Sequence, residues 1–368
     1  MHEAELDPTT INTASLPCRF VATDAMTLAA FDIEQEKRWN IQVVPYGFLA
    51  IHPGESQLHT PETVIARMIL YKGQDGDVYA FRPGLHLART VRDFAQIGFE
   101  RASEEILAAM LAKQAQADKR WIPRMSEKPA DRRYYVGLSG YPRVRGPRLV
   151  SSDISFQIQM IGAPMGRYKP HLIKVGILAE RPVVDGLGEY KFGSHYPASV
   201  RHMRRNYGDA SCDECLFINR NGIVQEGCSA NIFLAIGKKG KDGKDLIVAA
   251  SEPNILQGIT RQSFLELAER IGMEAREEEI SFNDLSVELK DPKAEAFMTG
   301  TAMSGLCQVG ELVKRESNGD LNTIYYCGSD ITSEKLGPIS AKLQRNFELI
   351  LQRKHPDNEL NDWMQKVD

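Results

Sequence analysis

The stretch GEYKFGSHY (188–196) contains a single lysine, Lys191, among glycines and aromatic residues. Most lysines of a globular protein are charged groups on its surface. A lysine that is held away from water prefers its charged form less strongly, and its free amine is then a nucleophile toward aldehydes. Lys191 is therefore the first candidate for a catalytic group, and the motifs that follow it decide what kind.

Three further motifs follow Lys191 along the chain. In EGCSAN (226–231), at the end of a predicted hairpin strand, a buried Glu226 carboxylate could keep a pyridine nitrogen protonated. In GITR (258–261) a loop enters a helix, where backbone N–H groups suit a phosphate. In TGTA (299–302) small residues let backbone N–H groups approach an anion. Each motif alone is commonly a solvent-exposed glutamate, an ordinary helix start or a plain turn, so their order carries the information.

In this order the motifs resemble the fold type IV enzymes that use pyridoxal 5′-phosphate (PLP), and among them the branched-chain aminotransferases. The first half agrees, because FRP (81–83) followed by LHLAR (85–89) resembles the family segment whose last arginine binds the cofactor phosphate. The similarity runs from about residue 46 to the C-terminal helix. It implies an α/β (α+β) fold of two domains, branched-chain aminotransferase-like or D-amino acid aminotransferase-like, with PLP in the cleft between them.

The resemblance also implies a role for each matching residue. Lys191 forms the imine with PLP and shuttles the substrate α-proton, Glu226 pairs with the pyridine nitrogen, and Tyr196 binds the phenolate oxygen. The implied phosphate contacts are Arg89, the N–H groups of Ile259 and Thr260, and Thr301. Ser229 matches a small polar residue near the phenolate oxygen and the phosphate, and Asn231 lies just beyond it.

The departures from the family pattern lie in the substrate-facing positions. The family stretch LHY…FEG corresponds to LHTPETVIAR (58–67), so that Thr60 replaces a tyrosine, Ile65 a phenylalanine and Arg67 a glycine. The family strand Tyr-(Ile/Val)-Arg-Pro corresponds to YVGL (135–138), so that Gly137 replaces an arginine that helps to hold substrate carboxylates. Cofactor-facing residues persist while substrate-facing ones change, which predicts retained chemistry on a different substrate.

Three arginines are candidates to replace the one that is missing at Gly137: Arg67, Arg143 and Arg145. Most arginines are surface groups, but bidentate binding of a carboxylate is a specific use for a guanidinium in such a place. Ala302 completes the predicted substrate-binding residues. We expect an aminotransferase that moves an amino group between an amino acid and a 2-oxo acid, and not one specialised for leucine, isoleucine or valine with 2-oxoglutarate. A PLP lyase resembling aminodeoxychorismate lyase and a non-catalytic PLP-binding homologue remain alternatives.

Periodicity predicts a smaller N-terminal α/β domain (1–163), a Gly/Pro-rich linker (164–171) and a larger C-terminal α/β domain (172–368) that carries Lys191. Residues 1–35 are expected to be irregular. Hairpins are predicted at 63–81, with a turn at 73–76, and at 215–226, with a turn at 221–222. Amphipathic helices are predicted at 85–99, 103–117, 260–272 and 339–353.

The composition of the 368 residues excludes several classes of protein. The net charge is −4 without a long basic run, which argues against nucleic-acid binding. No apolar stretch of about 18 residues occurs, so no membrane span is expected. The acidic N-terminus is typical of neither a signal nor a transit peptide. Six cysteines are too few for a disulfide scaffold. The lone pair Cys212 and Cys215 predicts reduced thiols without a metal site, and a redox switch is the alternative. We expect a cytoplasmic protein, and the resemblance implies a homodimer that shares an active-site loop.

Overall fold

The computed structural model describes residues 23–31, 38–58, 62–125, 132–143, 155–166, 172–208 and 211–367. The chain forms two compact units. Unit 1 comprises Met1–Arg167, Lys191–Ser194 and Ile350–Asp368, and unit 2 comprises Tyr168–Tyr190 and His195–Leu349. The chain therefore leaves unit 2 for four residues, at the position of the candidate lysine, and returns to it.

This division differs from the one predicted from the sequence. Residues 164–166, expected in a linker, continue a strand that ends at Gly166, and residues 167–171 lie outside the described part. Lys191, expected in the C-terminal domain, belongs to unit 1, and so does the end of the chain from Ile350. As a result the two units are of similar size. Local periodicity cannot show that segments 191–194 and 350–368 join the unit formed by the first part of the chain.

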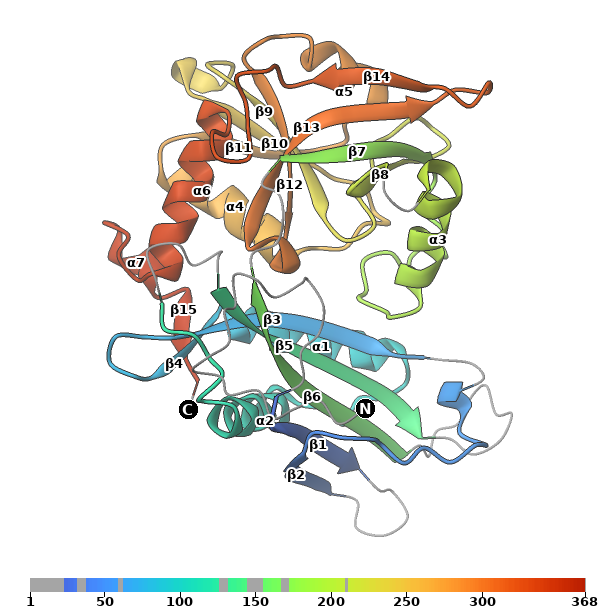
Figure 1. Ribbon diagram of the computed structural model, residues 1–368, viewed down its shortest axis with the longest axis vertical. Coiled ribbons are helices and arrows are strands. Elements are labelled where there is room, and N and C mark those ends of the chain that lie inside the picture. The colour runs from blue at the N-terminus through green and yellow to red at the C-terminus, as the bar shows by residue number, and fades with distance from the viewer. Residues whose placement is uncertain are drawn as a thin grey trace. The chain divides into compact units, whose positions relative to one another are not determined.

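Unit 1 contains a seven-stranded sheet in the order β15-β4-β3-β5-β6-β1-β2 (Figure 1). Every neighbouring pair in it is antiparallel. The strands are β1 (Ala25–Phe31), β2 (Trp39–Pro45), β3 (Val64–Lys72), β4 (Val78–Phe81), β5 (Arg132–Arg143), β6 (Ser155–Gly166) and β15 (Met364–Lys366). The shorter elements of the unit are α7 (Asn358–Asn361) and a 3-10 turn, η2 (Ser56–Leu58).

Two helices, α1 (Pro83–Gln96) and α2 (Glu104–Ala117), pack on one face of this sheet. Ser103 caps α2 by accepting the Ile106 N–H. The face of β3 that includes Val64 is turned toward α1, because a Cβ on Gly140, the cross-strand partner of Val64, would meet the ring of Phe94. Residues at odd positions of β3 and β5 therefore face away from α1.

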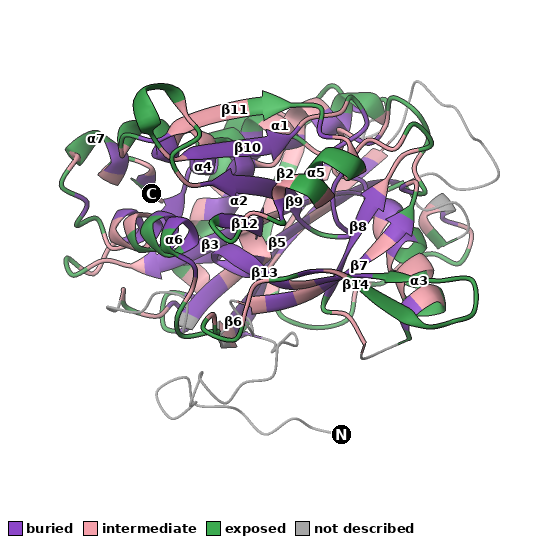
Figure 2. Cartoon of the chain, turned by 90° about the horizontal axis from the view of Figure 1, so that it is seen from above, coloured by how far each residue is buried: buried purple, intermediate pink, exposed green. Residues whose placement is uncertain are grey.

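Unit 2 contains an eight-stranded mixed sheet in the order β11-β10-β9-β12-β13-β7-β8, with β14 paired to β13. Its strands are β7 (Leu172–Ala179), β8 (Glu214–Ile218), β9 (Asn231–Ile236), β10 (Leu246–Ala250), β11 (Glu274–Glu278), β12 (Ala294–Gly300), β13 (Gly305–Arg315) and β14 (Leu321–Tyr326). Its helices are α3 (His195–Tyr207), α4 (Ile259–Arg270), α5 (Phe282–Glu288), α6 (Pro338–Leu351), and the 3-10 turns η4 (Lys241–Gly243) and η5 (Thr301–Met303). The central strands β9, β10 and β12 are almost wholly buried (Figure 2).

Most predicted elements are confirmed. The hairpin at 63–81 is β3 and β4, and the four predicted helices are α1, α2, α4 and α6. The turn at 221–222 is present, with Gly222 at φ 79, but residues 223–226 bond to β8 without forming a full strand. The expectation that residues 1–35 are irregular is wrong for β1, which lies between β2 and β6. No helix in the described ranges has the length and apolar character needed to cross a membrane.

Candidate active site

Lys191 begins a short segment, Lys191–Ser194, that joins the first sheet at the start of β3. Phe192 forms an antiparallel bridge with Val64. The Ile65 N–H donates to the Lys191 carbonyl at 3.0 Å, and the Gly193 N–H donates to the Thr63 carbonyl at 2.7 Å. The segment is therefore fixed through its backbone to the sheet of unit 1, and the Lys191 side chain is half-buried.

Helix α1 supplies a second anchor for this lysine segment. The Lys191 N–H donates to Oδ2 of the buried Asp93 at 3.0 Å. Arg92 donates to the other oxygen of Asp93 through Nε and Nη2, at 3.1 and 2.9 Å. Burial raises the pKa of Asp93 above its usual value. The buried Asp93 carboxylate thus accepts a hydrogen bond from the backbone of Lys191, the candidate catalytic residue.

His86 lies two turns before Asp93 on the same helix, and Arg89 lies between them. The imidazole is 2% exposed, and its Nδ1 has no partner among the described atoms. Burial, with the positive charges of Arg89 and Lys191, holds the pKa of His86 well below its usual value. His86 is therefore neutral at pH 7, and the cations beside it make this part of unit 1 favourable for an anion.

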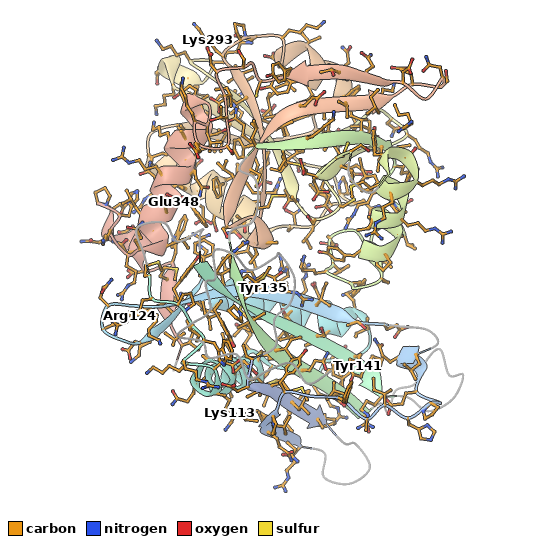
Figure 3. The ribbon with its side chains drawn as sticks, in the orientation of Figure 1. Lys113, Arg124, Tyr135, Tyr141, Lys293 and Glu348 are labelled. Carbon is orange, nitrogen blue, oxygen red and sulfur yellow. The ribbon has the colours of Figure 1, made fainter. Side chains whose placement is uncertain are left out.

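Arg67 and Gly137 are direct cross-strand partners on β3 and β5. Nη1 of Arg67 donates to the carbonyls of Ala66 and Leu138 at 2.9 and 3.0 Å. A Cβ on Gly137 would lie 3.3 Å from the same Nη1, so the guanidinium occupies the space above the glycine. Tyr135, labelled in Figure 3, lies on the same face, with its ring 6.0 Å from Arg67 Cζ. Gly137, where the resemblance implies an arginine, is thus covered by the guanidinium of Arg67 from the neighbouring strand.

The other predicted substrate residues have different surroundings. Ile65 shares the outward face of β3 with Arg67 and lies near Gly193, where an added Cβ would be 3.7 Å from its methyl group. Arg143 donates to the buried carboxylate of Glu55 at 2.8 Å, so its charge already has a partner. Thr60 and Arg145 lie outside the described residues.

Glu226 is the buried acid that the sequence predicts, with 4% of its surface exposed. Oε1 accepts the Leu256 N–H at 3.0 Å and contacts Nη1 of Arg181 at 2.6 Å. Oε2 accepts the side-chain amide of Asn231 at 2.9 Å. The carboxylate is held on both oxygens, and the role of Asn231 that the sequence left undefined is to orient it.

Ser229 is organised by a residue that sequence reasoning missed. Its hydroxyl donates to Oε2 of Glu214 at 2.5 Å. The Glu214 carboxylate also accepts the backbone N–H groups of Cys215, Cys228 and Ser229. Burial raises the pKa of Glu214. Glu214 therefore fixes the turn that follows Glu226, and no motif in the sequence marks it.

The predicted anion-binding segments of unit 2 lie around Asn231. Gly258, the N-cap of α4, provides no side-chain cap, so the first N–H groups of the helix, which include those of Ile259 and Thr260, have no acceptor within it. A Cβ on Gly258 would lie 2.2 Å from Asn231 Oδ1, and one on Gly300 would lie 3.4 Å from the Ser229 carbonyl. Thr301 and Ala302 begin η5 directly after Gly300, and both are half-buried.

Tyr196 and the cysteines complete the predicted set. Tyr196 is the second residue of α3, half-buried, and its contact with the phenolate oxygen stays a prediction. Cys215 lies against Cys228 rather than Cys212, with 2.6 Å between the two Sγ atoms, and all three are reduced. Glu214, Cys215 and Cys228 bring possible metal ligands within 4.8 Å of one another. Because hydrogen bonds already occupy the Glu214 oxygens, we assign no metal to this cluster.

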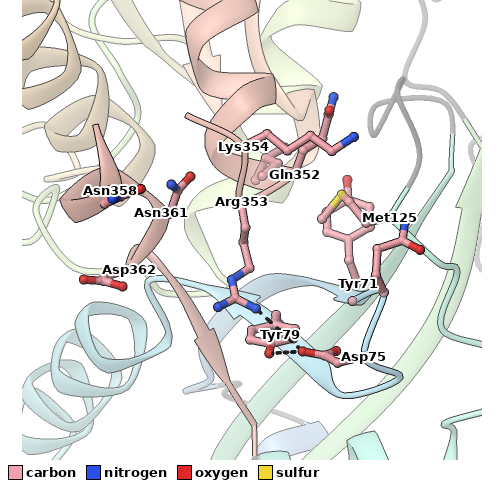
Figure 4. A pocket seen from close by; sticks show the side chains of 13 residues that line it. Tyr71, Asp75, Tyr79, Met125, Gln352, Arg353, Lys354, Asn358, Asn361 and Asp362 are labelled. Atoms are coloured by element: carbon pink, nitrogen blue, oxygen red, sulfur yellow. Dashed lines mark hydrogen bonds and ion pairs between the residues drawn. The ribbon is translucent and has the colours of Figure 1, made fainter. Parts of the chain in front are cut away.

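A large cavity of unit 1 lies elsewhere. Its volume is about 810 Å³, and none of the predicted site residues lines it. Figure 4 shows Arg353 over the ring of Tyr79, whose hydroxyl donates to Asp75 at 2.6 Å. These contacts attach the segment around Arg353 to the β3–β4 hairpin within unit 1, and they contribute nothing to the predicted chemistry.

Comparisons with known proteins identify the family of the chain. The sequence model of the amino-transferase class IV family matches residues 70–310. The chain belongs to this family. Class IV aminotransferases use PLP, so the predictions of fold class, cofactor and enzyme class are confirmed. The roles of the individual residues remain predictions.

Several relatives of this aminotransferase are known. It is 27% identical over 336 residues to branched-chain-amino-acid transaminase 1 of Bacillus subtilis (strain 168), and these residues cover 86% of this chain and 90% of that protein. It is 28% identical over 301 residues to a probable branched-chain-amino-acid aminotransferase of Staphylococcus aureus (strain N315), covering 79% and 80%.

Solved structures show the same fold. The branched-chain aminotransferase of Thermoproteus uzoniensis with norvaline matches with a TM-score of 0.69 at 19% identity, covering 94% of this chain and 100% of that chain. The enzyme of Thermobaculum terrenum in its PLP form matches with a TM-score of 0.71 at 16% identity, with the same coverage.

The side chains of this aminotransferase fit PLP. Unit 2 offers a buried acceptor, Glu226, for the ring nitrogen and an uncapped helix start for the phosphate. Unit 1 offers the amine of Lys191 and the charge of Arg89 beside the neutral His86. Sequence reasoning named the groups that are predicted to contact the cofactor. It missed the residues that hold them, because these lie far away in the chain.

Proposed function

We propose that this enzyme transfers an amino group between an amino acid and a 2-oxo acid, and that its substrates differ from those of enzymes specialised for leucine, isoleucine and valine. The observation that supports this proposal is that Arg67 covers Gly137, the position at which the family resemblance implies an arginine. Bound PLP supplies the electron sink that stabilises charge at the substrate α-carbon. The Nζ of Lys191 removes the α-proton and returns it after the charge has moved.

The other roles follow from the contacts of each unit. Glu226, oriented by Asn231, accepts a hydrogen bond from the ring nitrogen. The N-terminus of α4, Thr301 and Arg89 hold the phosphate, whose negative charge is favoured by the helix dipole and the guanidinium. Ser229, which Glu214 keeps in place, is assigned a contact near the phenolate oxygen and the phosphate. Tyr196 binds the phenolate oxygen.

Arg67 is the best placed of the three candidate arginines to bind a substrate carboxylate. Its guanidinium is half-buried on the open face of the sheet, and no acidic partner is found for it in the described ranges. Arg67 lies two residues after Ile65 on β3, so the two residues are about 7 Å apart along the strand. The Ile65 N–H donates to the Lys191 carbonyl, which places Arg67 close to the lysine segment. Arg143 is already paired with Glu55, so Arg67 is the arginine available for a carboxylate.

A substrate screen tests the proposal. Purified holoenzyme is mixed with each common amino acid, and loss of the absorbance band of the bound cofactor reports the first half reaction. Return of that band on addition of a 2-oxo acid reports the second. Lys191→Ala should abolish both steps, and Arg67→Met should raise KM about tenfold or more, since it removes a charge-assisted contact. Arg143→Met, at an arginine that is already paired with Glu55, is the matched control and should leave KM unchanged.

The same screen separates the alternatives. A lyase would release its product without a 2-oxo acid and would not accumulate the pyridoxamine form. A non-catalytic homologue would bind PLP and leave the band unchanged with every amine. Either result would contradict the proposal, as would full turnover by Lys191→Ala.

We further infer a cytoplasmic homodimer that completes each active site with a loop from its partner. Exposed apolar side chains are frequent in residues 43–58 of unit 1, where Phe48 is fully exposed and Val43, Tyr46 and Leu58 are also exposed. Such a group favours association. Light scattering coupled to size exclusion should give twice the chain mass, and Phe48→Ser should shift the equilibrium toward monomer.

A further inference from the structure

Arg181 contacts three segments of unit 2: the one that precedes Lys191 in the chain, the one that contains Glu226 and the one that precedes α4. Its Nη1 contacts Oε1 of Glu226 at 2.6 Å, the Gly188 carbonyl at 3.1 Å and the Asn254 carbonyl at 3.3 Å. Gly188 lies three residues before Lys191 in the sequence, and Asn254 lies shortly before the start of α4. One guanidinium nitrogen thus contacts the segment before Lys191, the Glu226 carboxylate and the segment before α4.

The surroundings of Arg181 leave little freedom in this junction. The Gly188 N–H donates to Oδ1 of Asn254 at 2.9 Å, and a Cβ on Gly188 would lie 1.9 Å from the Asn254 carbonyl oxygen. The Arg181 N–H donates to Oε1 of Gln225 at 2.9 Å, next to Glu226 in the chain. The three segments are therefore packed against one another with no space for a side chain at Gly188.

Burial makes this ion pair unusual. The side chains of Arg181 and Glu226 are 7% and 5% exposed. Moving two charges out of water is costly, and apolar residues of similar size would stabilise the fold at least as well. A guanidinium beside a carboxylate also favours the anionic form of the carboxylate, which is the form that accepts a hydrogen bond from a protonated ring nitrogen. The ion pair therefore keeps the Glu226 carboxylate anionic, which apolar residues of the same size would not do.

We propose that Arg181 is a positioning residue that keeps Glu226 ionised and aimed at the pyridine nitrogen of PLP. The inference rests on the proposed pairing of Glu226 with that nitrogen. Arg181 affects the cofactor only by way of Glu226. Its hydrogen bonds to the carbonyls of Gly188 and Asn254 also keep these two segments next to the acid. Lysine cannot replace it fully, because an ammonium lacks the planar, rigid set of donors.

The test uses holoenzyme loaded with PLP that carries ¹⁵N in the ring. The ¹⁵N resonance of bound PLP reports whether the ring nitrogen is protonated. In Arg181→Met we expect this resonance to move toward that of a neutral pyridine. We also expect the PLP-free protein to bind PLP at least tenfold more weakly, about 1.4 kcal/mol. Arg181→Lys should give intermediate values for both measurements, and it carries the test if Arg181→Met does not fold.

Two controls make the result specific. Arg220→Met removes a neighbouring ion pair, with Glu180, in which Arg220 is 86% exposed, and should change neither measurement. Glu226→Gln should move the ¹⁵N resonance in the same direction as Arg181→Met. If Glu226→Gln leaves the resonance unmoved, the proposed role of Glu226 is wrong.

A different result would overturn the role of Arg181 alone. If Glu226→Gln moves the resonance but the Arg181 variants bind PLP with the wild-type resonance, the inference fails while the proposed function stands. Arg181 would then be only structural, and its loss would lower the unfolding temperature of the PLP-free protein without altering the ring nitrogen.

Discussion

Replacing Asp93 with alanine tests how the lysine segment is held. Asp93 is buried on α1, and its Oδ2 accepts the Lys191 N–H at 3.0 Å. In Asp93→Ala this partly buried donor loses its acceptor, which costs about 1–2 kcal/mol. Local opening of Lys191–Ser194 becomes easier by the same amount, so the Lys191 amide hydrogen should exchange about 5 to 30 times faster. The measurement is hydrogen exchange by mass spectrometry on peptides that cover 188–196 of the PLP-free protein.

Asp93→Asn is the matched control. Its side-chain carbonyl still accepts the Lys191 N–H, and it removes the charge whose burial raises the pKa of Asp93. Arg92, which is 40% exposed, can turn its guanidinium into water. We therefore expect an exchange rate near that of the wild type, while peptides of α4 stay unchanged in both variants. Equal exchange in Asp93→Ala and wild type, or equal acceleration in both variants, would refute the role given to this carboxylate.

Three further predictions concern other residues of the candidate site. Because burial and neighbouring cations hold the pKa of His86 well below that of the unfolded chain, stability should fall below about pH 6.5 by up to about 1.4 kcal/mol per pH unit. His86→Asn should flatten this loss in denaturant titrations at pH 7.5 and 5.5, and the exposed His52→Asn should not. Glu214→Gln turns an acceptor into a donor against backbone N–H groups and should cost about 2–3 kcal/mol; an unchanged unfolding midpoint would contradict this. Gly137→Ala places a methyl group 3.3 Å from Arg67 Nη1 and should raise KM while kcat changes little, whereas a fall in kcat alone would argue against it.

The sequence was informative where local pattern and local structure coincide. The hairpin at β3 and β4 has two apolar runs separated by a short polar turn that contains glycine, and α1 has apolar residues at helical spacing. Strand β1 (AMTLAAF) was missed because its apolar residues do not alternate and its flanks are polar. It became a strand because β2 and β6 pair with it on both sides.

The sequence names candidate groups for contact with the cofactor, because their motifs occur in one order, and these contacts stay predictions. Their supports were not predictable. Asp93 lies 98 residues from Lys191, and Arg181 lies in a different loop from Glu226, so no spacing rule connects either pair. The choice among three arginines also needed the structure, since only strand register reveals that Arg67 faces Gly137.

The last strand of the chain has a consequence for how the protein is made. β15 covers the edge of β4, although nearly 300 residues separate them in the sequence. A ribosome releases the rest of the first sheet long before it completes residues 364–366, and until then β4 presents an open edge that can pair with another chain. Expression of a truncated gene that ends near residue 167 should therefore yield inclusion bodies, and chaperone demand should be highest late in synthesis.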